Sequence, residues 1–429
     1  MKRSLFARLS AMMFLEFFVW GAWYTSVAVY MTNHGMENLT HWPFTVNPIA
    51  AIAAPFFVGL IADRYFATEK VLGTLHLLGA GFMALAPFAV NAPVVFILLL
   101  LAYNLCYMPT MSLANTLAFA NMSDQEQEFP YIRVSGTVGW IVAGLVVSFG
   151  LGAFVGQEVR PEATALPLYL TAGVSLLFGL YSFTLPHTPP PAAGEEVSIR
   201  SIIGVDALKK LGSTSFYVFL GSSLLISIPL AAYYNFTQVY LGVAGFEQIA
   251  AVQTIGQMSE VLFMLLMPFF FVRLGVKWML GAGMFAWVVR YGLFAMGAPD
   301  AVTWMILGGI ALHGICYDFF FVTGQIYVDK KATADIRGQG QGLIVLVTYG
   351  VGMLIGAQVA GQVYNGFLGT QDALTLSQWY DFWWIPAIFA AAVMVFFLIF
   401  FNDRVVEGED ESISTVPGVE GEEEEVATA

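Results

Sequence analysis

Long apolar stretches, separated by short polar breaks, occupy most of this chain of 429 residues. A helix that crosses a bilayer needs about 20 mostly apolar residues, and stretches of that length recur from residue 8 to residue 402. Hydrophobic residues make up 58% of the chain and charged residues 11%, whereas soluble globular proteins have about 45–50% and about 25%. A soluble chain must still present a polar exterior. The sequence therefore predicts an all-α integral membrane protein and argues against a soluble enzyme.

Twelve stretches qualify as transmembrane helices. Their approximate limits are 8–31, 44–62, 70–91, 94–121, 129–154, 165–185, 216–242, 247–273, 277–297, 302–327, 340–366 and 378–402. The first stretch is too long for the core of a signal peptide and carries a Glu, so we expect it to be retained as a helix.

The longest break between these stretches, residues 186–215, contains four prolines and divides the chain into six spans and six spans. Each half also carries a basic turn between its second and third spans. Corresponding features in two halves are typical of transporters that are built from a repeated unit. We therefore expect a six-helix bundle over residues 1–185, a linker over 186–215, a second six-helix bundle over 216–402 and an acidic tail over 403–429.

The tail accounts for most of the net charge. It carries ten acidic residues and one basic residue, which is −9 of the formal −13. Like charges at this density, with little apolar surface to bury, predict a disordered, solvated end. No basic patch points to nucleic acid as a partner.

Lysine and arginine fall almost entirely on one side of the twelve-span arrangement. That side receives fifteen of the seventeen, namely Lys2, Arg3, Arg8, Arg64, Lys70, Arg133, Arg200, Lys209, Lys210, Arg273, Lys277, Lys330, Lys331, Arg337 and Arg404. Cytoplasmic loops are enriched in these residues. We therefore expect both termini to be cytoplasmic.

Several segments resemble a known family. Residues 59–64 (Gly-Leu-Ile-Ala-Asp-Arg), with Lys70, resemble the loop signature of the major facilitator superfamily. Five further elements are similar to those of the nucleoside:proton symporter family, the bacterial nucleoside permeases: residues 17–23, 129–139, 184–187, 286–291, and the pair 257–260 with 317–320.

The resemblance covers most of residues 10–365. It implies a carrier with a major facilitator fold in the bacterial inner membrane. This carrier would import nucleosides with protons by alternating access. It also implies a cytoplasmic gating loop that contains Asp63 and Arg64. The alternatives are the same carrier with a sugar, a nucleobase or a modified nucleoside as cargo, or a nutrient sensor that does not transport.

Ionisable side chains within spans are costly in the bilayer and mark functional sites. Here they are Glu16, His76, Arg133, Glu260, Arg290, His313 and Asp318. Gln257 and Glu260 share one helical face, where a carboxylate beside an amide can bind a polyhydroxylated or heterocyclic ligand. The resemblance implies that this pair recognises nucleoside. A hydrogen bond between helices is the alternative.

Arg133, Thr137 and Trp140 also share one helical face. The Arg and the hydroxyl can hydrogen-bond a sugar or a base, and the indole can stack on a base. The resemblance implies that these positions contact substrate, with Trp140 in place of a more common Phe. The alternative for Arg133 is a basic anchor near the membrane interface.

Asp318 follows Tyr317, and His313 lies four residues before Tyr317, so His313 and Tyr317 can face one cavity. Burial disfavours the charged form of a carboxyl group, so a buried Asp can exchange a proton, and the resemblance implies that Asp318 is needed for transport. Glu260 is a second candidate for proton coupling. A permanent ion pair with Arg290 would instead keep Asp318 charged and make it structural.

Several positions differ from the family pattern or stay open. Some relatives carry amides in the seventh span, where this chain places Tyr234, or Asn235 after a shift of one residue. His313 and Tyr317 stand where relatives carry Tyr and Phe. Glu16 can add a titratable group to the cavity or bond to a neighbouring helix, and His76 shows no partner, so we expect it to pack or to face lipid.

The sequence contains none of the common catalytic motifs, so we expect no enzyme activity, no cofactor and no metal site. Cys106 and Cys316 lie in apolar stretches and read as free, buried thiols. Gly352 and Gly356 read as positions of close helix packing. We expect a monomer in the lipid bilayer whose ligands are a nucleoside and a proton.

Overall fold

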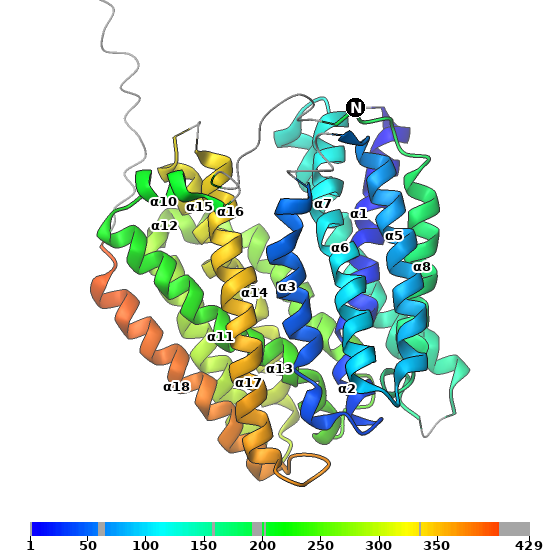
Figure 1. The fold of residues 1–429 in the computed structure, drawn as a ribbon. Coiled ribbons are helices and arrows are strands. Elements are labelled where there is room, and N and C mark those ends of the chain that lie inside the picture. Colours follow the sequence, from blue (N-terminus) through cyan, green and yellow to red (C-terminus); the bar gives the residue numbers. More distant parts are fainter. Residues whose placement is uncertain are drawn as a thin grey trace, which may run out of the picture.

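The computed structural model describes residues 2–58, 65–156, 159–190, 200, 203–333 and 336–402, and in these ranges the chain forms helices joined by turns (Figure 1). The helices are α1 (Arg3–Tyr24), α2 (Val27–Thr32), α3 (Trp42–Phe57), α5 (Thr68–Leu85), α6 (Pro93–Asn121), α7 (Gln125–Leu145), α8 (Leu166–Ser182), α10 (Val205–Lys210), α11 (Thr214–Val243), α12 (Ile249–Gly297), α13 (Thr303–Ala311), α14 (His313–Tyr317), α15 (Thr323–Lys331), α16 (Arg337–Val345), α17 (Met353–Leu368) and α18 (Leu376–Phe400).

Within the described ranges, nine helices or continuous helical segments are long and apolar enough to cross a membrane, and α8 is a shorter apolar helix. The chain is therefore a multi-pass membrane protein, as its apolar stretches predict. Three expected segments lie outside the described residues: the turn 59–64 with Asp63 and Arg64, part of the break 186–215, and the tail 403–429.

Several helices depart from regular geometry. The expected spans 247–273 and 277–297 both lie in α12, whose backbone leaves helical geometry at Gly275 (φ 65°, ψ 176°). Glycine adopts a positive φ without the steric cost of a side chain. Three π-helical segments, η4 (Val146–Gly150), η7 (Asp318–Val322) and η8 (Leu346–Gly352), continue α7, α14 and α16. Such segments are frequent at functional sites.

Helices from the two parts of the chain lie on opposite sides of Figure 1. We call α1–α8 the first set of helices and α10–α18 the second set. In the first set, α1 packs on α7 and α8, and α5 packs on α6 and α8; in the second, α12 packs on α18, and α11 packs on α17 and α18. The sets meet where α7 contacts α12, α3 contacts α17, and α2 contacts α11.

Glycines permit the closest helix contacts. The expected role of Gly352 and Gly356 is confirmed, because a Cβ on either would lie 2.7 Å from a Cβ on α11, that of Ser227 or Ala231. Cys106 and Cys316 are both buried and free, as expected.

The Gly139→Ala substitution should destabilise the first set of helices. A Cβ at Gly139 on α7 would collide with the backbone carbonyl of Phe14 on α1, which cannot turn aside as a flexible side chain can. We expect a loss of about 1–3 kcal/mol, seen as a lower unfolding temperature of the protein in nanodiscs. Gly173→Ala on α8 is the control, because a Cβ there meets nothing within 4 Å. Equal unfolding temperatures for the two variants would contradict this prediction.

Candidate functional site

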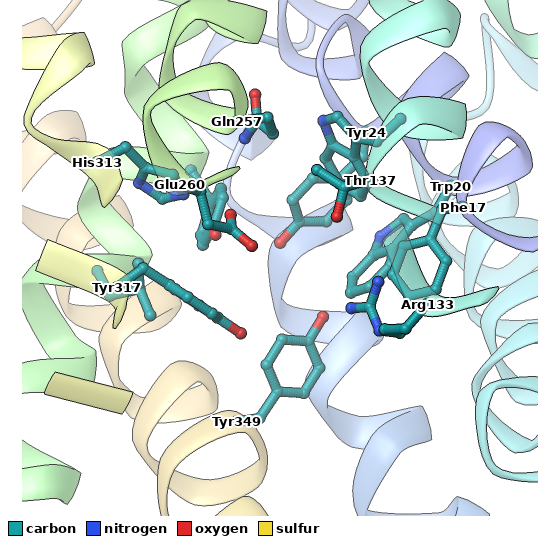
Figure 2. A pocket seen from close by; sticks show the side chains of 13 residues that line it. Phe17, Trp20, Tyr24, Arg133, Thr137, Gln257, Glu260, His313, Tyr317 and Tyr349 are labelled. Carbon is teal, nitrogen blue, oxygen red and sulfur yellow. The ribbon is translucent and has the colours of Figure 1, made fainter. Parts of the chain in front are cut away.

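A cavity of about 100 Å³ lies where the two sets of helices face each other (Figure 2). We call it the central pocket. Its lining comes from α1 and α7 of the first set and from α11, α12, α14 and η8 of the second. The lining residues are Phe17, Trp20, Tyr24, Arg133, Thr137, Trp140, Leu230, Tyr234, Gln257, Glu260, His313, Tyr317 and Tyr349.

Eight of the nine residues that the sequence places at the substrate site line this pocket, and Asn235 does not. Asn235 is fully buried, and its Nδ2 donates to the carbonyl oxygen of Ala357 on α17 at 3.5 Å. Consecutive helical residues point in different directions, so Tyr234 faces the pocket and Asn235 faces a neighbouring helix. The expectation that Asn235 faces the ligand is therefore not met.

Aromatic rings join the two walls of the pocket. Trp20 contacts Trp140 edge-on within the first set, with ring centroids 5.2 Å apart, and contacts Tyr349 across the interface at 6.0 Å. Tyr24 meets Tyr234 across the interface at 5.7 Å. Such rings supply apolar faces, while the tyrosine hydroxyls supply polar atoms at the rim.

The charged groups of the pocket stand on opposite walls. Glu260 projects from α12 and Arg133 from α7 (Figure 2), and the two are within electrostatic range of each other. The Arg133 guanidinium lies over the ring of Phe17, 4.1 Å from its centroid. Arg133 therefore faces the pocket, which favours the ligand-contact reading over an interfacial anchor.

Three buried polar atoms on lining residues have no partner: Gln257 Oε1, His313 Nδ1 and Trp20 Nε1. Most buried polar atoms in folded proteins are hydrogen-bonded. Unpartnered acceptors and donors that gather at one cavity are available to a ligand that brings the missing partners. The pocket can therefore hydrogen-bond a polar molecule while aromatic rings cover its flat faces.

The sequence did not identify Phe17, Trp20, Tyr24, Leu230 and Tyr349 as lining residues. Phe17, Trp20 and Tyr24 follow helical spacing on one face of α1, so their shared direction could have been read from the sequence. Tyr349 had no such signal. It lies in η8, and its hydroxyl donates to Asn47 Oδ1 on α3 at 2.6 Å.

Asp318 lies behind the pocket wall and not on it. It begins η7, is fully buried, and neither of its carboxylate oxygens has a hydrogen-bond partner. Glu260 is within electrostatic range of it. An unpaired carboxylate is costly to bury while it is charged, and a bound proton removes that cost.

Arg290 makes no ion pair with Asp318. Its guanidinium donates to the carbonyl oxygens of Gly309 at 2.9 Å and Ile310 at 3.5 Å, and lies 4.0 Å from the ring centroid of Tyr233. Of the two states left open for Asp318, the ion pair with Arg290 is therefore not the one observed, and among the described residues no cation pairs with Asp318.

Glu16 does not line the pocket. Its Oε2 lies 3.2 Å from Nε2 of His76, and its Oε1 accepts from Thr110 Oγ1 at 2.7 Å. Of the two readings left open for Glu16, the hydrogen bond to neighbouring helices is the one observed. His76 is buried and packs on Phe178, as one of its two expected placements requires, and Glu16 is a polar partner that the sequence did not reveal.

A larger cavity of about 750 Å³ adjoins the central pocket, and we call it the wide cavity. The two share Phe17, Trp20, Arg133, Leu230, Tyr317 and Tyr349. From there the wide cavity continues past Asn115, Gln325 and Gln341. Gln325 lies in α15 and Gln341 in α16, and both helices stand at the end of the molecule that bears α10 (Figure 1).

At the end of the molecule opposite the wide cavity, hydrogen bonds hold the two sets of helices together. The break between α1 and α2 frees backbone groups, and two buried amides from the second set satisfy them. Gln238 donates to the carbonyl oxygen of Tyr24 at 3.1 Å and accepts from the amide of Ala28 at 3.0 Å. Gln253 donates to the carbonyl oxygen of Thr25 at 3.0 Å.

A buried carboxylate adds to this closure. Glu162 is fully buried, and its Oε1 accepts from Ser148 Oγ at 2.6 Å and from the amide of Ala250, in the first turn of α12, at 3.0 Å. A carboxylate at a helix N-terminus is stabilising. The central pocket is thus adjoined by a wide cavity on one side and tied by hydrogen bonds on the other.

Comparisons with known proteins give a family match over nearly the whole chain. A family model described as "Nucleoside H+ symporter" matches residues 2–405. The chain is 40% identical over 428 residues to "Putative nucleoside transporter YegT" of Escherichia coli (strain K12), covering 96% of this chain and 98% of the relative. It is 30% identical over 420 residues to "Xanthosine permease" of the same organism, covering 93% and 96%.

A solved structure shares the fold. "Crystal structure of nucleoside transporter NupG" aligns with a TM-score of 0.80 and 28% identity, covering 93% of this chain and 100% of that one. By their names these relatives are transporters, which agrees with the expectation that the chain is not an enzyme.

Proposed function

Because the chain belongs to the nucleoside H+ symporter family, we propose that it imports nucleosides together with protons across the bacterial inner membrane. The observation that carries this proposal is the central pocket itself. It combines a cation, a carboxylate and an amide (Arg133, Glu260 and Gln257) with aromatic walls, between two sets of helices. A nucleoside has the matching parts, namely a flat base and a sugar with several hydroxyls.

The proposed architecture is a major facilitator fold of twelve spans in two six-helix bundles, residues 1–185 and 216–402, with a linker over 186–215 and a tail over 403–429. The two sets of helices support it, and so does Gly275, which would form the turn between two spans of α12. The positive-inside distribution supports cytoplasmic termini. The N-terminus lies at the same end as α10, α15 and α16 in Figure 1. We propose that the chain acts as a monomer.

Six of the lining residues have an assigned role in this proposal. The ring of Trp140 covers one face of the base, since aromatic rings stack on flat apolar surfaces, and Trp20, which meets Trp140 edge-on, borders the base. Arg133 and Thr137 donate to oxygen atoms of the base or sugar, and Glu260 accepts from sugar hydroxyls. Gln257 can do both, because an amide carries a donor and an acceptor.

The pocket adjoins a wide cavity at one end and is closed by hydrogen bonds at the other, which fits alternating access. The wide cavity lies on the proposed cytoplasmic side, whereas Gln238, Gln253 and Glu162 tie the periplasmic side. This arrangement supports an inward-facing state. Outward opening would require the second set to rotate away from α1 and α2, which would expose the backbone groups that those amides now satisfy.

Proton coupling is assigned to Asp318, with Glu260 as the link to the ligand. Asp318 is buried without a partner and lies within electrostatic range of Glu260, which lines the pocket. A change in the charge of Asp318 would alter the electrostatic free energy of the Glu260 carboxylate. It would therefore alter the free energy of ligand binding. Coupling follows if protonation also changes the balance between inward and outward states.

Uptake of labelled nucleosides by a bacterium that lacks its own nucleoside permeases tests this function. Cells that carry the chain should accumulate uridine or adenosine, and a protonophore should abolish accumulation. Competition by unlabelled sugars and nucleobases then defines the cargo, because only the true cargo competes fully. Proteoliposomes that bind nucleoside but accumulate none under an imposed pH gradient would overturn the transporter in favour of a sensor.

A further inference from the structure

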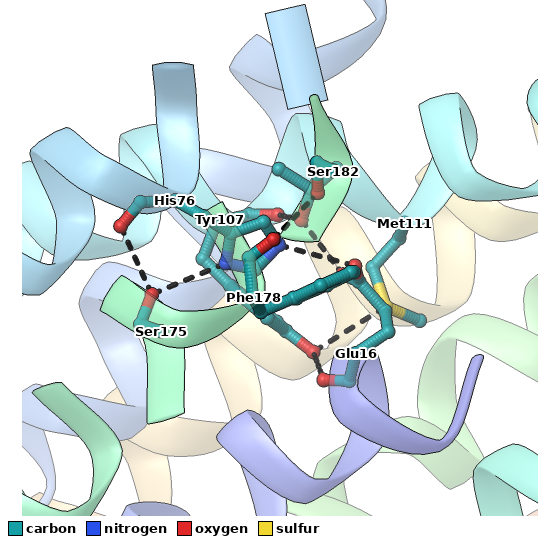
Figure 3. Close-up of polar contacts among 8 residues, drawn as sticks. Glu16, His76, Tyr107, Met111, Ser175, Phe178 and Ser182 are labelled. Carbon is teal, nitrogen blue, oxygen red and sulfur yellow. Dashed lines mark hydrogen bonds and ion pairs between the residues drawn. The ribbon is translucent and has the colours of Figure 1, made fainter. Parts of the chain in front are cut away.

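A carboxylate and an imidazole form a buried pair in the first set of helices, outside the central pocket (Figure 3). Glu16 on α1 is 0% exposed and His76 on α5 is 2% exposed. Two hydroxyl groups complete the network. Thr110 on α6 donates to Glu16, and Ser175 on α8 lies 3.1 Å from Nδ1 of His76. Four helices thus converge on one pair of titratable groups.

The hydroxyl of Ser175 has two possible acceptors. Its oxygen lies 3.0 Å from the backbone carbonyl oxygen of His76 and 3.1 Å from Nδ1 of the same residue. A serine hydroxyl carries one proton, which it can donate to only one of them. The acceptor to which the hydroxyl donates determines whether Nδ1 of His76 carries a hydrogen.

One choice requires an added proton. If Ser175 donates to the carbonyl oxygen, its own oxygen accepts from Nδ1–H of His76. Nε2 then faces the carboxylate of Glu16 at 3.2 Å, and two acceptors would oppose each other unless a proton lies between them. In this form the pair holds one bound proton and is electrically neutral.

The other choice releases that proton. If Ser175 donates to Nδ1, the neutral imidazole carries its hydrogen on Nε2 and donates to Glu16, which stays a carboxylate. Thr110 can assist in the same way, because it lies within reach of both Glu16 Oε1 and the carbonyl oxygen of Tyr107. Rotation of hydroxyl groups therefore keeps both ring nitrogens of His76 hydrogen-bonded in either form, while the bond from Ser175 to the carbonyl oxygen exists only in the form that holds the added proton.

We propose that Glu16 and His76 form a proton-binding site that is separate from Asp318, takes up a single proton, and passes its charge state through α1 to the central pocket. Its role in transport rests on the proposed function, whereas proton uptake by the pair does not. The charge of the pair changes in the buried interior, where few other charged groups can compensate for it. The titratable groups that face the pair are Tyr103 and Tyr107 from α6, with Arg133 of α7 beyond them, while α8 presents Ser175, Phe178 and Ser182.

The pair lies one layer of side chains behind the pocket wall. Tyr107 donates to the backbone carbonyl of Glu16 at 2.7 Å, and its hydroxyl lies 3.6 Å from Sδ of Met111, which lines the wide cavity. The ring of Tyr107 lies 5.9 Å from that of Trp20, one helical turn after Glu16. A charge on Glu16 therefore acts on the segment of α1 that carries three pocket residues.

Nitrogen NMR of protein with labelled histidine tests proton uptake without any nucleoside. The chain has five histidines, and His76→Gln identifies the His76 signal by its loss. In the intact protein, Nδ1 of His76 should change from protonated to unprotonated as the pH rises. In Glu16→Gln this change should be lost. A signal from Nδ1 that never changes with pH, or that changes identically in Glu16→Gln, would overturn the proposal.

The chain supplies a matched control in a second carboxylate–imidazole pair. Glu69 Oε1 lies 2.9 Å from Nδ1 of His187, whose side chain is 68% exposed. Glu69→Gln should alter the His187 signal and leave the titration of His76 unchanged.

Nucleoside binding as a function of pH tests the link to the pocket. One linked proton contributes a slope of up to about one to log Kd against pH. Glu16→Gln and His76→Gln should both lose that contribution while still binding nucleoside, and Asp318→Asn should keep it. If the pH profiles of both variants match that of the unmodified protein, the pair does not act on the pocket. If no form of the protein binds nucleoside, the proposed function fails while the NMR result still decides proton uptake.

Discussion

Asp318→Asn should abolish the accumulation of nucleoside driven by a pH gradient. Asn has nearly the shape of a protonated Asp, so it can replace Asp318 in the packed interior without a charge. It cannot release a proton, and the chain would then bind and exchange nucleoside without coupling to the gradient. Linkage requires that a group which drives accumulation changes its proton occupancy between the two states.

Proteoliposomes separate coupling from binding in this variant. Under an imposed pH gradient, Asp318→Asn should bring internal and external nucleoside to equal concentrations, whereas the unmodified chain should concentrate it. Exchange of labelled for unlabelled nucleoside should persist. Asp329→Asn is the control, because Asp329 is partly exposed and pairs with Arg337 at 3.3 Å. Full accumulation in Asp318→Asn would remove Asp318 from the coupling role.

The helices could largely be predicted from the sequence because bilayer thickness imposes their length. The expected stretch 94–121 is α6 (Pro93–Asn121), and 216–242 is α11 (Thr214–Val243). The expected stretch 8–31 contains a break that hydropathy could not reveal, since both α1 and α2 are apolar. The backbone groups at that break are satisfied by Gln238 and Gln253, more than 200 residues away.

The pocket could be predicted where residues share a helix. Arg133, Thr137 and Trp140 lie on one face of α7, and Gln257 and Glu260 on one face of α12, so helical spacing alone places each group together. The expectation that these two helical faces oppose each other came from the family resemblance. The direction of Asn235 could not be decided in this way, because it depended on a shift of one residue.

Contacts between distant helices carried no sequence signal. Glu16 and His76 are 60 residues apart, and each alone reads as an isolated polar residue in an apolar stretch. Arg290 and Asp318 suggested an ion pair because opposite charges occur in neighbouring spans. The structure instead places the Arg290 guanidinium against the backbone carbonyl of Gly309 and over the ring of Tyr233, and its Nη1 has no hydrogen-bond partner.

Gln257→Ala should weaken nucleoside binding by about 5- to 150-fold, which corresponds to the about 1–3 kcal/mol lost when a buried polar partner is removed. Gln257 lines the pocket, and its Oε1 has no partner within the protein. The ligand would supply that partner, so the loss should appear directly in the affinity measured by calorimetry.

Gln253→Ala is the matched control, one helical turn earlier on α12. Gln253 does not line the pocket, and it donates to the carbonyl oxygen of Thr25 at the tied end. Its loss should destabilise the proposed inward-facing state and favour outward opening. In a background of Cys106→Ala and Cys316→Ala, the pocket variant Leu230→Cys reports this opening through labelling by an impermeant thiol reagent that is added outside whole cells.

The two glutamines should therefore give opposite patterns. Gln253→Ala should speed external labelling of Leu230→Cys, because the carbonyl of Thr25 no longer holds α12 to α1. Gln257→Ala should leave that rate unchanged while losing affinity. If both variants lost affinity equally and neither changed the labelling rate, the pocket and the tied end would not be separate parts of the molecule, and alternating access around this pocket would have no support from these contacts.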